Sequence, residues 1–326
     1  MKYSISALQE LTKIHSVSGD TLRIIQYLQE RLKKSRIETK ITDFGVLVCG
    51  NLKNPKVMIS AHVDDVGFQI VNQNIDGTFQ VMKSGHVDAA MLNNTTVYVE
   101  TKKGSIPGVI LPKKELGNNN VQNFTDILLD TLNNKSVSIG DFGSYTHFFS
   151  QSENKIIASG LDNRACIEVL LEIIIENPQI LKNTLFAFVT EEENTYDCIT
   201  GISNLYKPQY ALVVDMLPVN QIDPTKVEKI PSVGNGPAVL YSMHSYKLHP
   251  YIRESLKNIK IPYQMAFMDI NFPPEPQMVQ KNGITKGINI FLPMLGWHNA
   301  AYSMQISDAE KTKKFITELH SLLLNS

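Results

Sequence analysis

Two stretches near the start of the chain have apolar residues every three or four positions, which predicts amphipathic helices. The first helix is expected over residues 4–14 and the second over 20–34, with Asp20 as a candidate N-cap. The segment Val57–Ala61 is apolar throughout and leads directly into His62-Val63-Asp64-Asp65. A strand that is apolar on both faces indicates a sheet that helices cover on each side.

The pattern changes between residues 68 and 157, where short β-rich runs alternate with Asn, Gly, Lys and Pro. This texture predicts a small β-domain of barrel or sandwich type, in which only Phe124–Leu132 has a helical pattern. From residue 158 helices and strands alternate again. The elements expected there are a helix over Asp162–Ile175, strands over Leu185–Val189 and Tyr210–Val214, a helix near 249–257, strands near 263–267 and 288–292, and a last helix over Asp308–Leu324.

These patterns together predict an α/β fold, in which a mixed central sheet is covered by helices and a small β-barrel-like domain is inserted. The α/β domain is expected over residues 1–67 and 158–326, and the insert over 68–157. A chain of 326 residues is long enough for this arrangement.

Charge, hydropathy and cysteine content narrow the class of protein. The 31 basic and 32 acidic residues almost cancel, so nothing favours a nucleic-acid partner. No stretch approaches the roughly 18 apolar residues of a membrane span, and the N-terminus has no continuous apolar segment typical of a signal peptide. The three cysteines form no CxxC pair, which favours reduced, buried thiols over a thiolate zinc site. We therefore expect a cytoplasmic protein without nucleic-acid or membrane partners.

Acidic and histidine side chains stand where several predicted strands end or a helix begins. In open α/β sheets, sites form beyond the carboxyl ends of the strands. Buried carboxylates need a compensating charge, and a divalent cation is the natural partner. The side chains concerned are His62, Asp64, Asp162, Glu191–Glu193, Asp215 and His298.

The types of ligand indicate which metal such a site would hold. Imidazole and carboxylate groups without a thiolate suit Zn²⁺, Co²⁺ or Mn²⁺. Two histidines and three acids are too many for one catalytic zinc with an open position. They fit two metals that share a bridging carboxylate, as in hydrolytic two-metal sites.

Five short motifs follow one another along the chain. They are Ala61-His62-Val63-Asp64-Asp65-Val66-Gly67, Leu161-Asp162-Asn163-Arg164, Val189-Thr190-Glu191-Glu192-Glu193, Val214-Asp215 and, in the expected insert, Lys103-Gly104-Ser105-Ile106-Pro107-Gly108-Val109-Ile110. These segments resemble the AH-x-D-E-x-G, L-D-D/N-R, V-Q-E-E and A-V-D motifs, and the insert, of metallopeptidase family forty-two, the glutamyl and tetrahedral aminopeptidases. The resemblance covers nearly the whole chain and implies a cytoplasmic dinuclear-metal aminopeptidase with a fold of the zinc-peptidase type.

The resemblance also implies which residues hold the metals. His62 and Asp215 would bind one ion. Glu193 and His298 would bind the other, and Asp162 would bridge the two. The implied cofactors are two divalent metal ions, with Zn²⁺ as the first choice and Co²⁺ or Mn²⁺ as alternatives.

Two further residues are implied to act beside the metals. Asp64 would accept the imidazole N–H of His62 and fix its tautomer. Glu192 would be the general base for a metal-bridging hydroxide and would return the proton to the leaving amine. Three consecutive glutamates leave the register open by one, and we take Glu192 and Glu193 because the family pair follows one other polar residue, here Glu191. Adjacent side chains on an extended segment point to opposite sides, so the two can have different roles.

Three segments depart from the family pattern. Asn194-Thr195-Tyr196-Asp197 stand where the family has a glycine after its glutamate pair. Gly296–Tyr302 keep the histidine of R-Y-x-H-S-P-x-E but not its arginine, tyrosine or glutamate, and Met268–Asn271 reduce a G-G-T-D-A segment. Family members form the substrate pocket near these positions. The chemistry is therefore expected to be intact, whereas the choice of substrate is open.

The expected activity is hydrolysis of N-terminal residues from short peptides. Two other functions stay open: a metal-dependent deacylase or amidohydrolase acting on a small acylated amine, and a non-catalytic divergent homologue. Similar proteins have also been labelled glycoside hydrolases; glycoside hydrolysis by paired carboxylates needs no metal, so loss of activity with a chelator would decide against it. The resemblance also implies a homo-oligomer built of dimers, which in similar proteins form a dodecamer through the inserted domain.

Each metal-site residue also has a purely structural interpretation. A helix N-cap needs only one oxygen, and a histidine beside an aromatic ring can simply pack in the core. The structural interpretations are a surface histidine for His62, an N-cap for Asp162, a solvated acidic run for Glu191–Glu193, a strand-end acid for Asp215 and a core histidine for His298.

Overall fold

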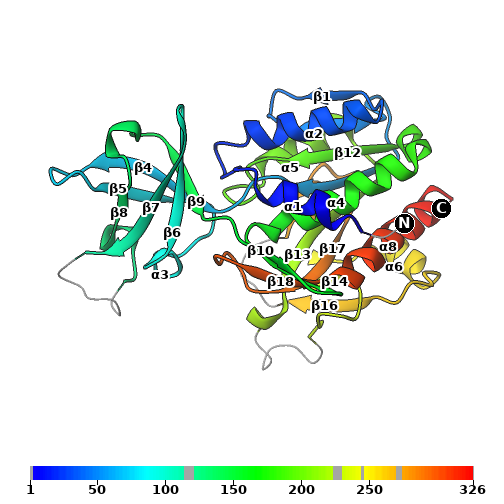
Figure 1. Ribbon diagram of the computed structural model, residues 1–326. Helices are drawn as coiled ribbons and strands as arrows, with labels where there is room; N and C mark the ends of the chain where they lie inside the picture. The colour runs from blue at the N-terminus through cyan, green and yellow to red at the C-terminus, as the bar shows by residue number, and fades with distance from the viewer. Residues whose placement is uncertain (1–2, 114–120, 223–229, 244–245, 269–273, 326) are drawn as a thin grey trace.

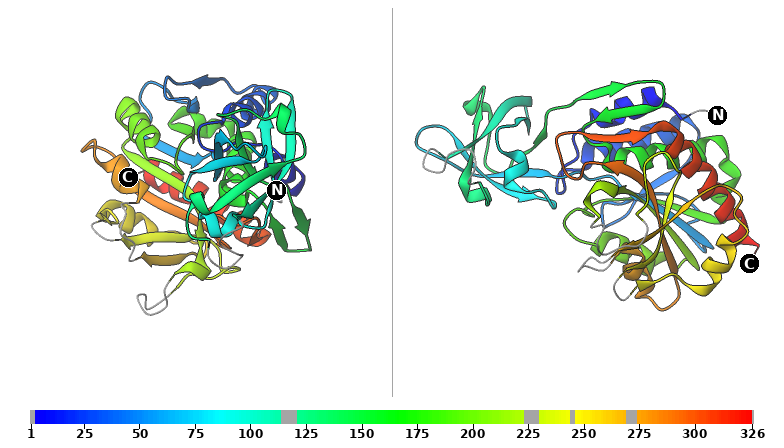
Figure 2. Two further views of the ribbon diagram at one scale, coloured as in Figure 1. Left: turned by 90° about the vertical axis from the view of Figure 1, so that its left-hand side faces the viewer. Right: turned by 90° about the horizontal axis from the view of Figure 1, so that it is seen from below.

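The computed structural model describes residues 3–325 except 114–120, 223–229, 244–245 and 269–273. Within these residues the chain forms a twelve-stranded mixed sheet with helices, and a closed six-stranded barrel. The barrel projects from one end of the layered body, as Figure 1 and the right-hand view of Figure 2 show. The predicted fold class, a helix-covered mixed sheet with a small β-barrel, is confirmed.

The large sheet has a parallel centre. Its strands are β1 (Thr39–Ile41), β2 (Leu47–Gly50), β3 (Val57–His62), β10 (Phe149–Gln151), β11 (Lys155–Ala158), β12 (Thr184–Val189), β13 (Tyr210–Pro218), β14 (Ala238–Met243), β15 (Tyr246–Lys247), β16 (Gln264–Met268), β17 (Lys286–Leu295) and β18 (Tyr302–Gln305). The spatial order is β1-β2-β12-β3-β13-β17-β18-β11-β10, and β14 attaches β15 and β16 beside β17. The neighbours β12, β3, β13 and β17 are parallel to one another, so their carboxyl ends share one edge.

Helices cover both faces of this sheet. They are α1 (Ile5–Thr12), α2 (Leu22–Lys34), α4 (Leu161–Glu176), α5 (Asp197–Tyr206), α6 (Pro250–Leu256), α7 (Glu275–Gln280) and α8 (Ile306–Leu324). On β3, Ile59 packs in the core shared with α1, α2, α4, α6 and α8, whereas its neighbour Met58 packs in the core shared with α5 and α7. A strand with side chains in two cores must be apolar on both faces, which is the pattern of Val57–Ala61.

The barrel has a hydrophobic core of its own. Its strands are β4 (Gly67–Gln73), β5 (Phe79–Ser84), β6 (Thr96–Thr101), β7 (Gly104–Pro112), β8 (Ile127–Thr131) and β9 (Phe142–Tyr145), closed in the order β4-β5-β8-β7-β6-β9, and a short helix, α3 (Ala89–Leu92), follows β5. The helix predicted over Phe124–Leu132 is wrong, because a 3₁₀ turn at Phe124–Asp126 leads into β8. Ile127 and Leu129 are buried and Leu128 between them is not, which is the two-residue period of a strand paired with β5 and β7.

Sheet membership differs from the expected range at the end of the insert. The barrel strands end at Tyr145, whereas β10 and β11 pair with each other and β11 pairs with β18 of the large sheet. The range 68–157 therefore includes strands of the large sheet. β11 pairs with Tyr302–Gln305, far along the chain, and β10 joins the sheet only through β11.

Two further properties concern the helices and the cysteines of the described residues. None of its helices combines the length and the apolar character that crossing a bilayer requires. The three cysteines are buried and unpaired, as expected for reduced thiols.

Candidate metal centre

The parallel strands bring two of the predicted residues, His62 and Asp215, to one edge of the sheet. β3 ends at His62, and its neighbour β12 pairs Val189 with His62. On the other side, β13 pairs Val213 with Ser60, which places Asp215 level with His62. β13 continues beyond the predicted end of that strand, so Asp215 lies within the strand and not after it. The carboxyl ends of the strands form the edge at which ligands bind in open α/β sheets.

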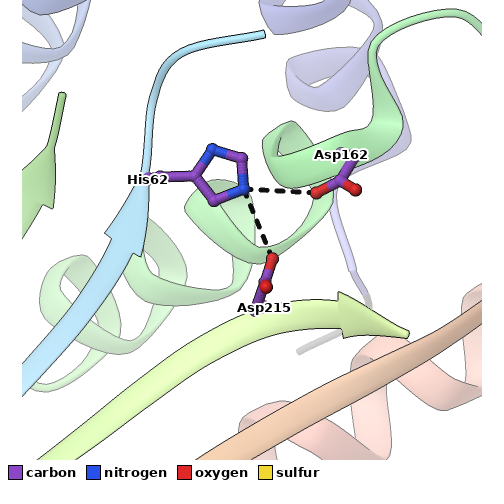
Figure 3. A group of neighbouring side chains, drawn as sticks. All are labelled: His62, Asp162 and Asp215. Atoms are coloured by element: carbon purple, nitrogen blue, oxygen red, sulfur yellow. Dashed lines mark ion pairs between the residues drawn. The ribbon is translucent and has the colours of Figure 1, made fainter. Parts of the chain in front are cut away.

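One half of the site is built around His62. Its Nε2 atom lies 3.3 Å from Oδ1 of Asp162, 3.3 Å from Oδ1 of Asp215 and 3.9 Å from Oε2 of Glu192. Figure 3 shows the side chains of Asp162 and Asp215 pointing at this nitrogen. Asp162 enters from the start of α4, directly after Gly160 and Leu161. Three elements that are far apart in sequence thus direct oxygens at one imidazole nitrogen.

The other half is built around His298, in the bend after β17. Its Nε2 atom lies 3.3 Å from Oε2 of Glu193, and its Nδ1 atom donates to the carbonyl oxygen of His86. The Tyr145 hydroxyl donates to the carbonyl oxygen of His298 at 3.2 Å. Asp162 offers ligand atoms to both halves, since it lies within 4.8 Å of donors from His62 and Asp215 and also from Glu193 and His298. The bridging position expected for Asp162 is compatible with this arrangement.

Asp64 lies behind the site rather than in it. The Nδ1 atom of His62 is 3.0 Å from the main-chain carbonyl oxygen of Asp64 and 3.7 Å from its carboxylate, so the carbonyl is the nearer acceptor. The Asp64 carboxylate instead accepts the main-chain N–H groups of Glu192 at 3.1 Å and Glu193 at 3.0 Å, and the hydroxyl of Ser18. Asp64 therefore orients the His62 ring chiefly through its backbone, and its carboxylate fixes the glutamate turn.

The three consecutive glutamates occupy a turn and not the extended segment that the sequence suggested. β12 ends at Val189, and Glu191 adopts a left-handed conformation with φ 63°. The Glu191 carboxylate accepts the N–H of Gly19 at 2.7 Å, away from the two histidines. Glu192 and Glu193 face the histidines instead. The two side chains separate because the Asp64 carboxylate holds both of their amides, which local sequence could not reveal.

Electrostatics link the two halves. Burial disfavours the charged ring of His62, yet the surrounding carboxylates, Glu192 first, raise the pKa of His62 well above its ordinary value. Burial likewise lowers the pKa of His298 and the charge of Glu193 raises it, and the net result is a pKa of about 9. Burial raises the pKa of Glu192 well above the usual range for glutamate. In the absence of metal, the surrounding acids thus favour the charged form of both histidine rings.

The donor set fits divalent metal ions. His62 Nδ1 faces an oxygen that only accepts, so when the ring gives up its second proton to a metal ion, the lone pair of Nε2 points at Asp162 and Asp215. Oδ1 of Asp162 is buried and accepts no hydrogen bond from the described residues. Converging lone pairs need a cation between them. The separations of 3.3 Å are close to the edge, about 3.3 Å, of a tetrahedron of ligands about 2.0–2.1 Å from a Zn²⁺ ion.

The structure places two further residues, Arg164 and Glu275, next to the site. Arg164 is buried, and its guanidinium donates to the carbonyl oxygens of Val63 and Ile14, which fixes the chain around His62. Sequence reasoning gave it no role. Glu275, the first residue of α7, is 4% exposed and lies within 4.8 Å of donor atoms of Glu192 and Asp215. Sequence reasoning missed it, because an acid in the first turn of a helix is ordinary.

The segments that depart from the expected motifs lie beside the site. Asn194 accepts the N–H of Gly85 at 2.8 Å, and the ring of Trp297 lies 4.5 Å from the ring of His298. Burial, and then the charges of Glu192 and Glu275, raise the pKa of Tyr196. Residues 269–271 of the reduced G-G-T-D-A segment lie outside the described residues.

Comparison with known proteins agrees with this geometry. A family model described as M42 glutamyl aminopeptidase matches residues 45–315. A putative aminopeptidase of Acetivibrio thermocellus is 25% identical over 322 residues, covering 95% of this chain and 96% of its own. Among solved structures, the TET1 peptidase of Pyrococcus horikoshii has a TM-score of 0.84 at 24% identity, covering 97% of this chain and 98% of its own. An aminopeptidase from Desulfurococcus kamchatkensis has a TM-score of 0.88 at 20% identity, with 98% and 96% covered. These similarities show a shared fold.

Proposed function

Because the chain belongs to the M42 glutamyl aminopeptidase family, we propose that it removes N-terminal residues from short peptides with two divalent metal ions. Family membership supports the class of activity, a hydrolase of the aminopeptidase type. The single observation that supports metal dependence is the convergence of five donors from five elements on the carboxyl edge of the sheet. These donors are His62, Asp162, Glu193, Asp215 and His298.

The proposed metal ligands fall into two sets that share one residue. His62 and Asp215 would hold one ion, Glu193 and His298 the other, and Asp162 both. Imidazole and carboxylate donors suit Zn²⁺ first, and also Co²⁺ or Mn²⁺. When bound, such a pair of ions supplies an acidified water and a Lewis acid for the scissile carbonyl.

Glu192 is the group that we assign to proton transfer. Its carboxylate lies 3.9 Å from Nε2 of His62. Glu193, by contrast, is paired with His298 at 3.3 Å, which leaves Glu192 as the freer acid of the two. Burial raises the pKa of Glu192, which brings a carboxyl group toward the range in which it both accepts and returns a proton. Glu192 would take a proton from the attacking water and give it to the leaving amine. Asp64 would hold the main-chain amide of Glu192, and so the Glu192 side chain, in place.

The direct test is hydrolysis of aminoacyl-anilides and short peptides by metal-stripped protein, with Zn²⁺, Co²⁺ or Mn²⁺ added back. We expect release of N-terminal residues only in the presence of metal. Two bound ions without any turnover of this panel would refute the proposal.

A second candidate follows from the departures beside the site. Asn194, Tyr196 and Trp297 stand near the histidines and glutamates, where the family pattern expects other residues. A metal-dependent deacylase acting on a small acylated amine would use the same metals and Glu192. N-acylated amines in the same panel distinguish the two, because an aminopeptidase requires a free amine and a deacylase does not.

We also propose that the protein is a homo-oligomer built of dimers, up to a dodecamer. The Pyrococcus horikoshii TET1 peptidase is described as assembling into a tetrahedron or a large octahedral shell. In this chain the barrel projects from the body, and Ile75, Leu132 and Ile139 on it are largely exposed. Large exposed apolar side chains on one projecting unit support a contact with other copies. Light scattering coupled to size exclusion measures the assembly, and a stable monomer at micromolar concentration would exclude it.

A further inference from the structure

Glu275 is a buried acid that the proposed chemistry does not use. It is 4% exposed at the start of α7, which packs against β13 and β17. No described residue donates a hydrogen bond to its carboxylate or pairs with it as an ion. An unpaired buried carboxylate destabilises a folded protein, so a cationic ligand that pairs with it would be bound favourably.

The carboxylate is directed at the His62 half of the site. One of its oxygens, one of Glu192 and one of Asp215 all lie within 4.8 Å of one another. Glu275 shares no such group with Asp162 or Glu193. It therefore lies beside the His62 half of the site, next to Glu192 and Asp215, where a ligand bound at that half would be within its reach.

Burial, and then the charge of Asp215, raise the pKa of Glu275, and a cation placed beside these three neighbouring acids would offset their repulsion. A third metal ion fits poorly, because Asp215 already faces His62 and Glu192 is assigned to proton transfer, which leaves one free carboxylate. One carboxylate is too few for a metal ion, but it is sufficient for a charge-assisted hydrogen bond to an ammonium group.

We propose that Glu275 binds a primary ammonium group of the substrate and so selects for substrates that carry one in the first residue. This inference rests on the proposed function, since it specifies the substrate of that same site. The ammonium is either the free α-amine or the side-chain amine of a basic first residue. Both have the same chemistry, and the experiment below distinguishes them.

The experiment compares Glu275→Gln with the wild type on lysyl and norleucyl anilides, which differ mainly in the side-chain charge. We expect KM to rise about tenfold or more while kcat changes little. A rise for both substrates assigns Glu275 to the α-amine, and a rise for the lysyl substrate alone assigns it to the side chain. Unchanged KM for both overturns the proposal. Glu275→Asp keeps the charge and should recover part of the loss, whereas Glu153→Gln, an exposed acid in the turn between β10 and β11, is the matched control.

Two readouts do not depend on turnover. Calorimetry with norleucine, lysine and N-acetylnorleucine should show weaker binding of the free amines to Glu275→Gln and no difference for the acetylated probe. Metal content should be the same in Glu275→Gln and the wild type, and loss of an ion would overturn the proposal in favour of a metal ligand. The melting temperature of the variant should equal or exceed that of the wild type, because an unpaired charge is removed; a marked fall would assign Glu275 a structural role instead.

Failure of this inference is distinguishable from failure of the proposed function. If the wild type turns over both anilides and Glu275→Gln has no effect, the aminopeptidase proposal is retained and the ammonium site at Glu275 is rejected. If the wild type shows no turnover despite two bound ions, the aminopeptidase proposal is rejected. Calorimetry with the amines then tests ammonium binding by Glu275 independently.

Discussion

The two halves of the metal centre are built by different means. His62 and Asp215 stand on adjacent parallel strands, and the register of β3 and β13 places them level with one another. His298 lies in a bend after β17 and adopts a left-handed conformation with φ 53°. It is held from outside the sheet by the carbonyl of His86, after β5, and by the hydroxyl of Tyr145, at the end of β9. One half thus depends on the sheet, and the other depends on contacts with the barrel.

The difference shows how an inserted unit becomes part of a site. A strand in the middle of a parallel sheet is fixed on both sides, so a ligand at its end needs little further support. A ligand in a bend needs hydrogen bonds from elsewhere to fix its ring, and such outer contacts strongly affect metal affinity. The barrel supplies those contacts here, so we expect its position to govern the His298 half more than the His62 half.

Removal of one histidine from each half has the largest expected effect. His62→Ala and His298→Ala should each retain roughly one of two metal equivalents and lose turnover to below detection, because each removes a ligand of a different ion. Elemental analysis of the purified variants gives the metal content. His249→Asn, which keeps the N-cap of α6, is the control. If His298→Ala kept both ions and its activity, His298 would be a packed core residue beside Trp297. The division of the metal centre into a His62 half and a His298 half would then be wrong.

The second-largest loss of activity is expected from substitution of Glu192, the glutamate assigned to proton transfer. Glu192→Gln should lower kcat by about 10²–10⁴-fold and leave the metal content unchanged, because the amide cannot take a proton. Glu191→Gln is the matched control, since its side chain faces Gly19 and should stay within a few-fold of the wild type. A large loss in Glu191→Gln with full activity in Glu192→Gln would shift the register of the triplet by one residue.

The pH dependence of the metal-free protein tests the His298 half by itself. The folded-state pKa of His298, about 9, lies above the unfolded value of about 6.5. A group raised in this way stabilises the fold fully below the unfolded pKa, and its contribution is lost as the pH rises through the folded pKa. The free energy of unfolding of the wild type relative to His298→Gln should therefore fall by about 3 kcal/mol between about pH 6 and pH 9. Denaturant titrations of both proteins with chelator present measure it, and a constant difference would contradict the ion pair with Glu193.

The smallest effect is expected where the barrel touches the bend. Tyr145→Phe removes the hydrogen bond to the carbonyl of His298, worth about 1 kcal/mol, and should weaken binding of one metal ion about fivefold. Competition with a chromophoric chelator resolves the two affinities. Tyr98→Phe, on the neighbouring β6, is the control. Equal weakening of both ions would show that the barrel does not act on one half alone.

Much of the fold was predictable because its signals are local. The apolar run of Val57–Ala61 and the change of texture after residue 67 follow from burial on two faces and from short barrel strands. β8 was mistaken for a helix because a run of nine residues rich in Leu and Ile fits either period until its partners are known. β10 and β11 were placed in the insert because β18, the strand that joins β11 to the large sheet, is far away in sequence.

The sequence by itself determined which side chains are available: histidines and acids after apolar strands, in an order that matches one family of aminopeptidases. Ligand chemistry is a property of residue types, and strand ends are visible in the hydrophobic pattern. Only the tertiary structure decided how these groups divide the work. Strand register set Asp215 beside His62, the Asp64 carboxylate turned Glu192 and Glu193 toward the histidines, and the barrel fixed His298. Burial of Glu275 against Glu192 and Asp215 depends on the packing of α7, because a charge becomes costly only through the groups that exclude water from it.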